Sequence, residues 1–148
     1  GLAAPGNVGT LLRSSEAFGA AGLLLVGGVD PYNPKVVRAA AGSAFRIPFA
    51  MVADDEAVDV LRRLAAADIA AWATVPAGGT PMAEMATSAG LSALVLGNEP
   101  HGLTEDVLAA CAGLVTVETT GNIDSLNVAV AGSVALYESC RSRDGRDA

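Results

Sequence analysis

Short apolar segments alternate with helix-forming segments along most of this 148-residue chain. The apolar segments are four to six residues long and are bounded by turn residues or helix-capping residues. Continuous apolar runs of this length are typical of strands buried on both faces, as in parallel sheets. We therefore expect one α/β domain with a largely parallel sheet and helices on both faces. The expected strands cover residues 23–26, 47–52, 69–74, 93–96 and 114–117.

Capping residues indicate where the connecting helices begin. Asn33 precedes Pro34, and proline favours the first helical position because its φ angle is preset and its missing N–H is not needed there. Residues 76–90 are ambiguous, since Thr80 is a possible helix start but the flanking glycines favour a loop. The expected helices cover 7–18 and 33–41, start at 54 or 55 and at 104, and end with 125–141.

The last expected helix is apolar on every side, and its first turn is polar. It has no charged residue until Glu138, which is typical of a buried helix. Asp124 and Ser125 are ordinary capping residues, whereas Asn127 is expected inside the first turn. This polar end must either pack against other loops or face a ligand. Two polar segments are candidate partners, residues 7–13 and 96–103.

The charge of the chain is unevenly distributed. The formal net charge is −7, which argues against a tight grip on a nucleic-acid backbone by this chain alone. Residues 1–50 carry a net charge of +2, and the remainder carries −9. The first third could therefore face a polyanion, although its four cations are too few for tight binding.

No segment of the sequence is long and apolar enough to span a bilayer, and no signal segment opens the chain. Cys111 and Cys140 form no disulfide framework and lack metal-ligand spacing. We interpret them as reduced structural thiols and expect a cytoplasmic protein with no membrane partner and no metal site.

Three short motifs, in order, resemble those of the SpoU (TrmH-like) branch of the SPOUT superfamily of RNA methyltransferases. The first has an Asn, a Gly two residues later and an Arg six residues after the Asn. The second reads apolar-apolar-Gly-x-Glu-x-x-Gly, and the third reads Ser-Leu-Asn-Val with a Leu-Tyr-Glu end. The matching residues are Asn7, Gly9 and Arg13, then 95–97, Glu99 and Gly102, then 125–128 and 136–138. Residues 30–35 also resemble the family's linking loop.

The resemblance covers nearly the whole chain and implies more than the pattern does. It implies a SPOUT-type fold with a C-terminal trefoil knot, whose loops near 97–103 and 118–124 bind S-adenosylmethionine. Residues 1–148 would be a single catalytic domain, from which an upstream RNA-binding domain is missing. The family works as homodimers on RNA, and we expect ribosomal RNA in preference to transfer RNA.

The site residues implied by the resemblance fall into two groups. Arg13 would bind a phosphate and stabilise the developing alkoxide, because a guanidinium is always protonated and is a poor base. Glu99 would hold Arg13 or loop N–H groups. The implied catalytic residues are Asn7, Arg13, Glu99, Ser125 and Asn127; the implied cofactor contacts are Thr74, Leu96, Gly97, Val117, Ile123 and Leu126.

Each of these residues also has a plain structural interpretation. Asn7 and Ser125 could be helix caps, and Arg13 a surface cation. The apolar cofactor contacts could simply be core. His101 is the only histidine, but the family motif does not require it.

The chain departs from the family pattern at three places. Residues 117–119 read Val-Glu-Thr where the family commonly has Ile-Pro-Met, so Glu118 places a carboxylate beside the expected pocket. Pro5 replaces an Asp often found two residues before the first-motif Asn. Pro100 follows Glu99 where a small residue is usual.

The function expected from the sequence is an S-adenosylmethionine-dependent RNA 2′-O-ribose methyltransferase. The alternative is a non-catalytic cofactor- or RNA-binding module. A nucleotide-binding oxidoreductase is excluded because no glycine-rich dinucleotide fingerprint follows the first strand.

Overall fold

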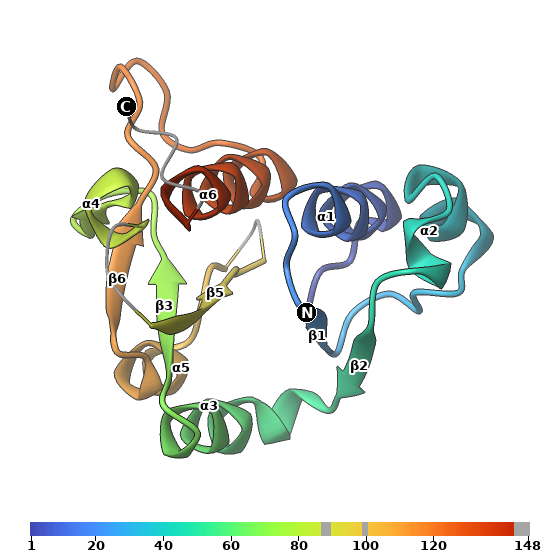
Figure 1. The fold of residues 1–148 in the computed structure, drawn as a ribbon, viewed down its shortest axis with the longest axis horizontal. Coiled ribbons are helices and arrows are strands. Elements are labelled where there is room, and N and C mark those ends of the chain that lie inside the picture. The colour runs from blue at the N-terminus through green and yellow to red at the C-terminus, as the bar shows by residue number, and fades with distance from the viewer. Residues whose placement is uncertain (87–89, 99–100, 144–148) are drawn as a thin grey trace.

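The computed structural model describes residues 1–86, 90–98 and 101–143, without the side chain of Arg143 (Figure 1). None of the helices in these ranges is long and apolar enough to cross a membrane. The helices are α1 (Pro5–Ala17), α2 (Pro34–Ala39), α3 (Ala57–Ala66), α4 (Met82–Ala86), α5 (Glu105–Ala110) and α6 (Val128–Arg143), with 3₁₀ turns η1 (Ser43–Phe45) and η2 (Asp54–Glu56). The strands are β1 (Leu23–Val26), β2 (Phe49–Val52), β3 (Ile69–Thr74), β4 (Thr80–Pro81), β5 (Leu91–Val95) and β6 (Gly113–Thr116).

Every strand pairing in the described residues is parallel, which confirms the expected α/β class. The strands divide into two sheets, a pair β1-β2 and a four-stranded sheet in the order β4-β6-β3-β5. The apolar pattern located the strands but could not show this division, because it carries no information about which strands are neighbours. The ambiguous region after residue 76 contains the short strand β4 and the helix α4.

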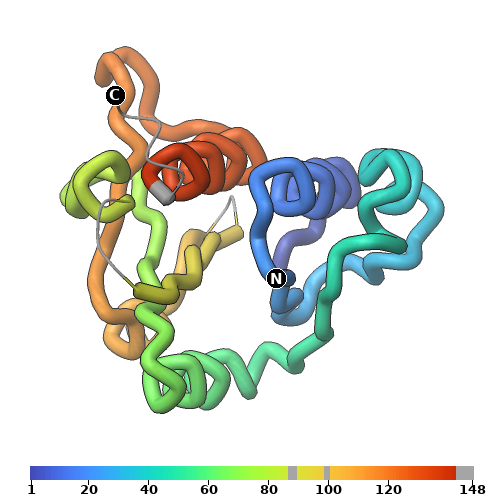
Figure 2. The backbone as a smooth tube through the Cα atoms, viewed as in Figure 1, coloured from blue at the N-terminus to red at the C-terminus, as the bar shows by residue number. Residues whose placement is uncertain are grey.

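Three helices form one layer, in which α1 lies between α6 and α2 (Figures 1 and 2). Gly9 allows α1 and α2 to approach closely, since a Cβ at this position would lie 2.4 Å from the Cβ of Ala39. Helices α4 and α6 contact each other on one side of the four-stranded sheet, and α3 and α5 contact each other on the other side (Figure 1).

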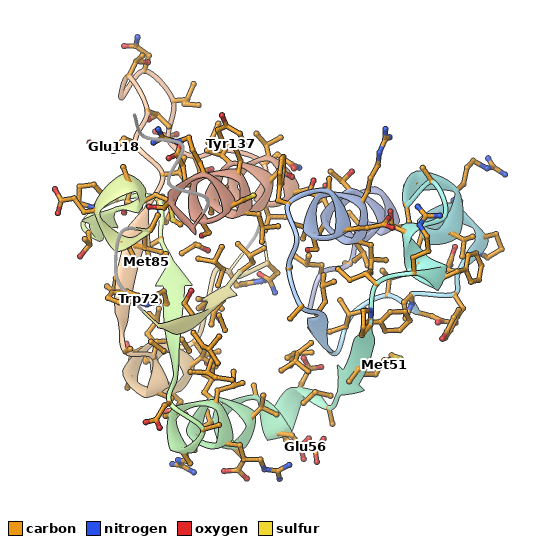
Figure 3. The ribbon with its side chains drawn as sticks, in the orientation of Figure 1. Met51, Glu56, Trp72, Met85, Glu118 and Tyr137 are labelled. Atoms are coloured by element: carbon orange, nitrogen blue, oxygen red, sulfur yellow. The ribbon has the colours of Figure 1, made fainter. Side chains whose placement is uncertain are left out.

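Two apolar clusters form the core. The first lies between α1, α2 and the β1-β2 pair, and the second lies under α4 and α6. Figure 3 shows Trp72 on β3 and Met85 on α4, which both belong to the second cluster. The buried members are Val8, Leu12, Val36, Ala40, Ala44 and Ile47 in the first cluster and Met82, Met85, Val115 and Ala135 in the second.

Helix starts agree with the sequence prediction in part. Asn33 caps α2 as expected, because its Oδ1 accepts the Lys35 N–H at 2.9 Å. The prediction for Asn7 as a cap is wrong: α1 begins earlier, at Pro5, and the motif asparagine lies inside the helix. Thr104 precedes α5 without a side-chain capping bond. Ahead of α3, Glu56 accepts the Ala53 N–H at 3.1 Å instead of an aspartate acting as cap.

Candidate active site

Asn7 and Asn127 bring the first and third motifs together. The Nδ2 of Asn127 donates to the Oδ1 of Asn7 at 3.1 Å. The Oδ1 of Asn127 accepts the N–H groups of Ala129 and Val130 at 2.9 and 3.2 Å, so Asn127 is the N-cap of α6 and not part of its first turn. The Oδ1 of Asn127 therefore caps α6, and the Nδ2 of the same side chain links the start of α6 to α1.

Contacts further along α1 and α6 continue from this asparagine pair. The Leu11 side chain packs against Gly132, where a Cβ would lie only 2.6 Å from the Leu11 Cδ2. Ser133 donates to the Ala129 carbonyl, so its Oγ accepts from the Ser14 hydroxyl at 2.7 Å.

The rings of Phe18 and Tyr137 then meet edge to face, with centroids 5.6 Å apart. Figure 3 shows Tyr137 on α6. In these successive contacts the residue numbers increase along both helices, so α1 and α6 run parallel.

Arg13 lies on a different side of α1 from Asn7. Six residues rotate about 240° around an α-helix and advance about 9 Å, so this spacing does not place the two side chains together. Arg13 is exposed, as are Gly6, Thr10 and Ala17 on the same side of the helix. The first motif therefore presents Asn7 to α6 and Arg13 to solvent.

The ends of β3, β5 and β6 lie side by side because β3 pairs with both of the other strands. Thr74 ends β3, and its hydroxyl donates to the Val95 carbonyl at 2.9 Å. The sequence-predicted positions Thr74, Gly97 and Val117 thus lie at or just after the ends of three adjacent parallel strands. Open α/β sheets bind ligands at this edge.

The turn after β5 folds back on itself. Gly102 donates its N–H to the Asn98 carbonyl at 2.9 Å, and His101 donates its N–H to the Asn98 Oδ1 at the same distance. A Cβ on Gly97 would lie 2.6 Å from the carbonyl carbon of Gly102. Glycine is therefore needed at 97 to close the turn. Glu99, predicted as catalytic, lies outside the described residues.

The apolar cofactor positions are not equivalent. Leu96 packs beside Gly132 on α6, and Val117 packs against the second core cluster, so both side chains have core roles. Leu126 is half-buried, whereas Ile123 is 53% exposed. Ile123 and the exposed Ser125 belong to the loop between β6 and α6, which projects from the body (Figure 1). Glu118 lies at the foot of this loop (Figure 3).

Sequence reasoning missed an ion-pair network beside Arg13. The Glu16 carboxylate accepts hydrogen bonds from the Arg46 guanidinium, at 2.9 Å from Nη2, and from the Ser43 hydroxyl. These hydrogen bonds, led by the one from Arg46, lower the pKa of Glu16 to about 2. The network joins α1 to η1. Its members are 27 and 30 residues apart, so no local sequence pattern could have indicated it.

Two surface hollows of about 590 and 450 Å³ lie elsewhere in the described part of the molecule. Both are lined by residues of α3 and α5 and their flanking segments, and neither lining includes a predicted site residue. Cys111 lines the second hollow, and burial raises the pKa of its thiol. We locate the candidate site at the strand ends and the starts of α1 and α6, because the contacts of Thr74, Gly97, Asn7 and Asn127 lie there.

Comparison with known sequences agrees with the motifs. The SpoU rRNA Methylase family matches residues 1–137. The 23S rRNA (uridine(2479)-2'-O)-methyltransferase of Streptomyces viridochromogenes is 36% identical over 97% of this chain and 52% of its own length. The 23S rRNA (guanosine(2553)-2'-O)-methyltransferase RlmP of Bacillus subtilis is 34% identical over 90% of this chain and 52% of its own length. The chain thus spans about half the length of these relatives.

Comparison with solved structures gives the same result. The SpoU methyltransferase AviRb from Streptomyces viridochromogenes, in complex with AdoMet, has a TM-score of 0.86 and 34% identity over 97% of this chain and 58% of its own. An AdoMet-bound rRNA methyltransferase from Sinorhizobium meliloti also has a TM-score of 0.86 and 34% identity, over 96% of this chain and 53% of its own.

Proposed function

The chain belongs to the SpoU rRNA Methylase family, and from this membership we propose that it is the catalytic domain of an S-adenosylmethionine-dependent RNA methyltransferase. The reaction proposed is methylation of a ribose 2′-hydroxyl, in ribosomal RNA in preference to transfer RNA. The observation that carries the proposal is the hydrogen bond between Asn7 and Asn127, which joins the first and third motifs.

The strand-end edge is chemically suited to the proposed cofactor. Gly97 lies just after β5 and is half-buried, and with no side chain it leaves its backbone open to approach by a ligand from the side away from Gly102. When bound, S-adenosylmethionine would supply a methyl group on a positively charged sulfur. We assign its contacts to Thr74, Leu96, Gly97, Val117, Ile123 and Leu126, with Leu96 and Val117 contributing mainly backbone because their side chains have core contacts.

Arg13 is assigned to the RNA. Its exposed position allows the guanidinium to hold a phosphate with two parallel hydrogen bonds and to stabilise negative charge on the ribose oxygen. Asn7 and Asn127 join the starts of α1 and α6, and so fix the position of the helix that carries Arg13. Glu99 and Ser125 complete the proposed catalytic set.

A homodimer is part of the proposal. The small residues Ala129, Gly132 and Ala135 of α6 are buried within the chain, so they do not supply an interface. Val130, Val134 and Tyr137 are exposed, and their spacing of four and three residues places them on one face of the helix. This apolar stripe supports pairing of α6 with a second copy.

We also propose that a further, upstream domain supplies most of the RNA affinity. The matched relatives are about twice as long as this chain, and its net charge of −7 disfavours tight binding to phosphates. A cytoplasmic location belongs to the same proposal, and so does a C-terminal trefoil knot.

Radiolabelled methyl transfer tests this function. The full-length protein that contains this chain would be incubated with methyl-labelled S-adenosylmethionine and unmodified ribosomal RNA, and the RNA would then be digested to nucleosides. We expect label on one nucleoside, attached to its ribose. Label on a base, or no transfer by folded protein, would contradict the proposal.

A further inference from the structure

One stretch of the chain combines cations and aromatic rings and lacks carboxylates. Residues 31–53 contain three basic residues and three of the six aromatic residues of the chain, but no Asp or Glu. The rest of the protein is strongly acidic. A stretch with this composition favours a polyanionic partner that also has flat apolar groups.

Two of these aromatic rings are exposed, although the chain has only six aromatic residues. Phe45, in η1, is 70% exposed, and Tyr32, just before α2, is 61% exposed. The Tyr32 ring rests against the Phe49 ring with centroids 5.6 Å apart, and the backbone N–H of Tyr32 donates to the Asp30 carboxylate at 2.8 Å. Tyr32 is therefore held in place with much of its surface accessible.

Lys35 and Arg38 are exposed on α2. They are three residues apart and so lie on one side of the helix, while Val36 and Ala40 are buried against the first core cluster. The third cation, Arg46, is paired with Glu16 and anchors η1 to α1. The structure thus exposes two cations and two aromatic rings within residues 32–45, the segment that contains α2 and η1.

This unit adjoins the helix that carries Arg13. Helix α2 packs against α1 at Gly9, one helical turn before Arg13. A strand of RNA that reaches Arg13 through a phosphate could therefore continue across α2.

We propose that Tyr32, Lys35, Arg38 and Phe45 form a surface that binds unpaired RNA next to the target nucleotide, here called the α2 surface. The rings would stack on bases, and the cations would contact phosphates. An acidic protein segment would need only the cations for binding. The exposed aromatic rings favour RNA, because its bases can stack on them. The inference rests on the proposed function, because RNA is its substrate.

Fluorescence anisotropy with a short unpaired RNA, measured on the chain at several low salt concentrations, tests the α2 surface. Phe45→Ala and Tyr32→Ala should each weaken binding by about fivefold or more, because stacking on one base is worth at least about 1 kcal/mol. Phe45→Tyr keeps a ring and should retain affinity. Lys35→Ala combined with Arg38→Ala should reduce the slope of log K against log salt by about 1.4.

Arg63→Ala is the matched control, since Arg63 is an exposed cation on α3, at the far side of the fold. It should bind RNA nearly as well as the wild type, and all variants should melt within a few degrees of it. Equal binding by Phe45→Ala and wild type would overturn the α2 surface. So would absence of RNA binding by the wild type, or competition by polyglutamate as effective as that by RNA. Any of these results, with 2′-O methylation by the full-length protein intact, would leave the proposed function standing.

Discussion

Residues 1–50 and the rest of the chain differ in charge, in sheet and in what they expose. The first part carries a net charge of +2, contains α1 and α2, and exposes Tyr32 and Phe45. The second part carries −9 and ends its four-stranded sheet in glycine-containing turns. This difference fits the proposed division of roles, in which the first part would face the RNA and the second part would hold the methyl donor.

Helix α1 is the junction between the two parts. One side of it packs on α2 at Gly9, a second packs on α6 through Leu11 and Ser14, and a third exposes Arg13. Substitutions in one part should therefore change RNA chemistry or cofactor affinity, but not both.

Arg13→Ala should have the largest effect and should separate the two parts most clearly. Loss of a preorganised electrostatic contact costs about 2.7–4 kcal/mol, so methyl transfer by the full-length protein should fall about 10²–10³-fold. S-adenosylmethionine affinity should be nearly unchanged, because Arg13 is not at the strand ends. Arg13→Lys should also be poor, since an ammonium cannot form the two parallel hydrogen bonds. Full methyl-transfer activity of Arg13→Ala would show that the first motif serves only in helix packing and not in catalysis.

Gly97→Val should act on the other part. Its Cβ would collide with the Gly102 backbone and open the turn, so cofactor affinity should fall about ten- to a hundredfold, as for a misfit of about 1–3 kcal/mol. Ser92→Val, at the exposed start of β5, is the control and should bind normally. Calorimetry measures both affinities. Normal cofactor binding by Gly97→Val would show that the cofactor site does not include this turn.

Two glycines of α1 test whether the helix contact itself is tight. Gly9→Ala should lower the free energy of unfolding by about 1–3 kcal/mol, because its methyl group would overlap Ala39. Gly6→Ala should raise the free energy of unfolding by about 0.5–1 kcal/mol, since a Cβ there meets nothing within 4 Å and alanine favours the helix. Urea denaturation gives both values. Equal effects would show that α1 and α2 are not closely packed.

Glu16→Gln should have the smallest effect, a modest decrease in melting temperature at neutral pH. The pKa of Glu16 is about 2 in the folded chain, against an ordinary value of 4.5. The stabilisation is therefore present above pH 4.5 and is lost as the pH falls toward 2. The difference in melting temperature between wild type and Glu16→Gln should shrink over this pH range. A constant difference would mean that the ion pair does not stabilise the fold.

The elements of the fold were largely predictable, because short apolar runs and proline positions are local signals. The expected strands 23–26 and 69–74 coincide with β1 and β3. The division into two sheets was not predictable, since it depends on pairing between distant segments.

The candidate site was predictable as a set of positions, but less so as a set of roles. The motifs identified Asn7 and Asn127, yet only the structure shows that Asn127 caps α6 and binds Asn7 across 120 residues. Leu96 was expected as the last residue of a strand and lies directly after β5, but its side chain packs beside Gly132 because α6 returns to that position. Such roles depend on tertiary contacts, which residue spacing does not encode.

A calorimetric titration of the purified chain with S-adenosylmethionine tests the central claim most directly. If the strand ends of the second part form the methyl-donor site, the folded chain binds the cofactor with one site per chain and without RNA. Absence of heat at millimolar cofactor, from protein shown to be folded, would contradict the account.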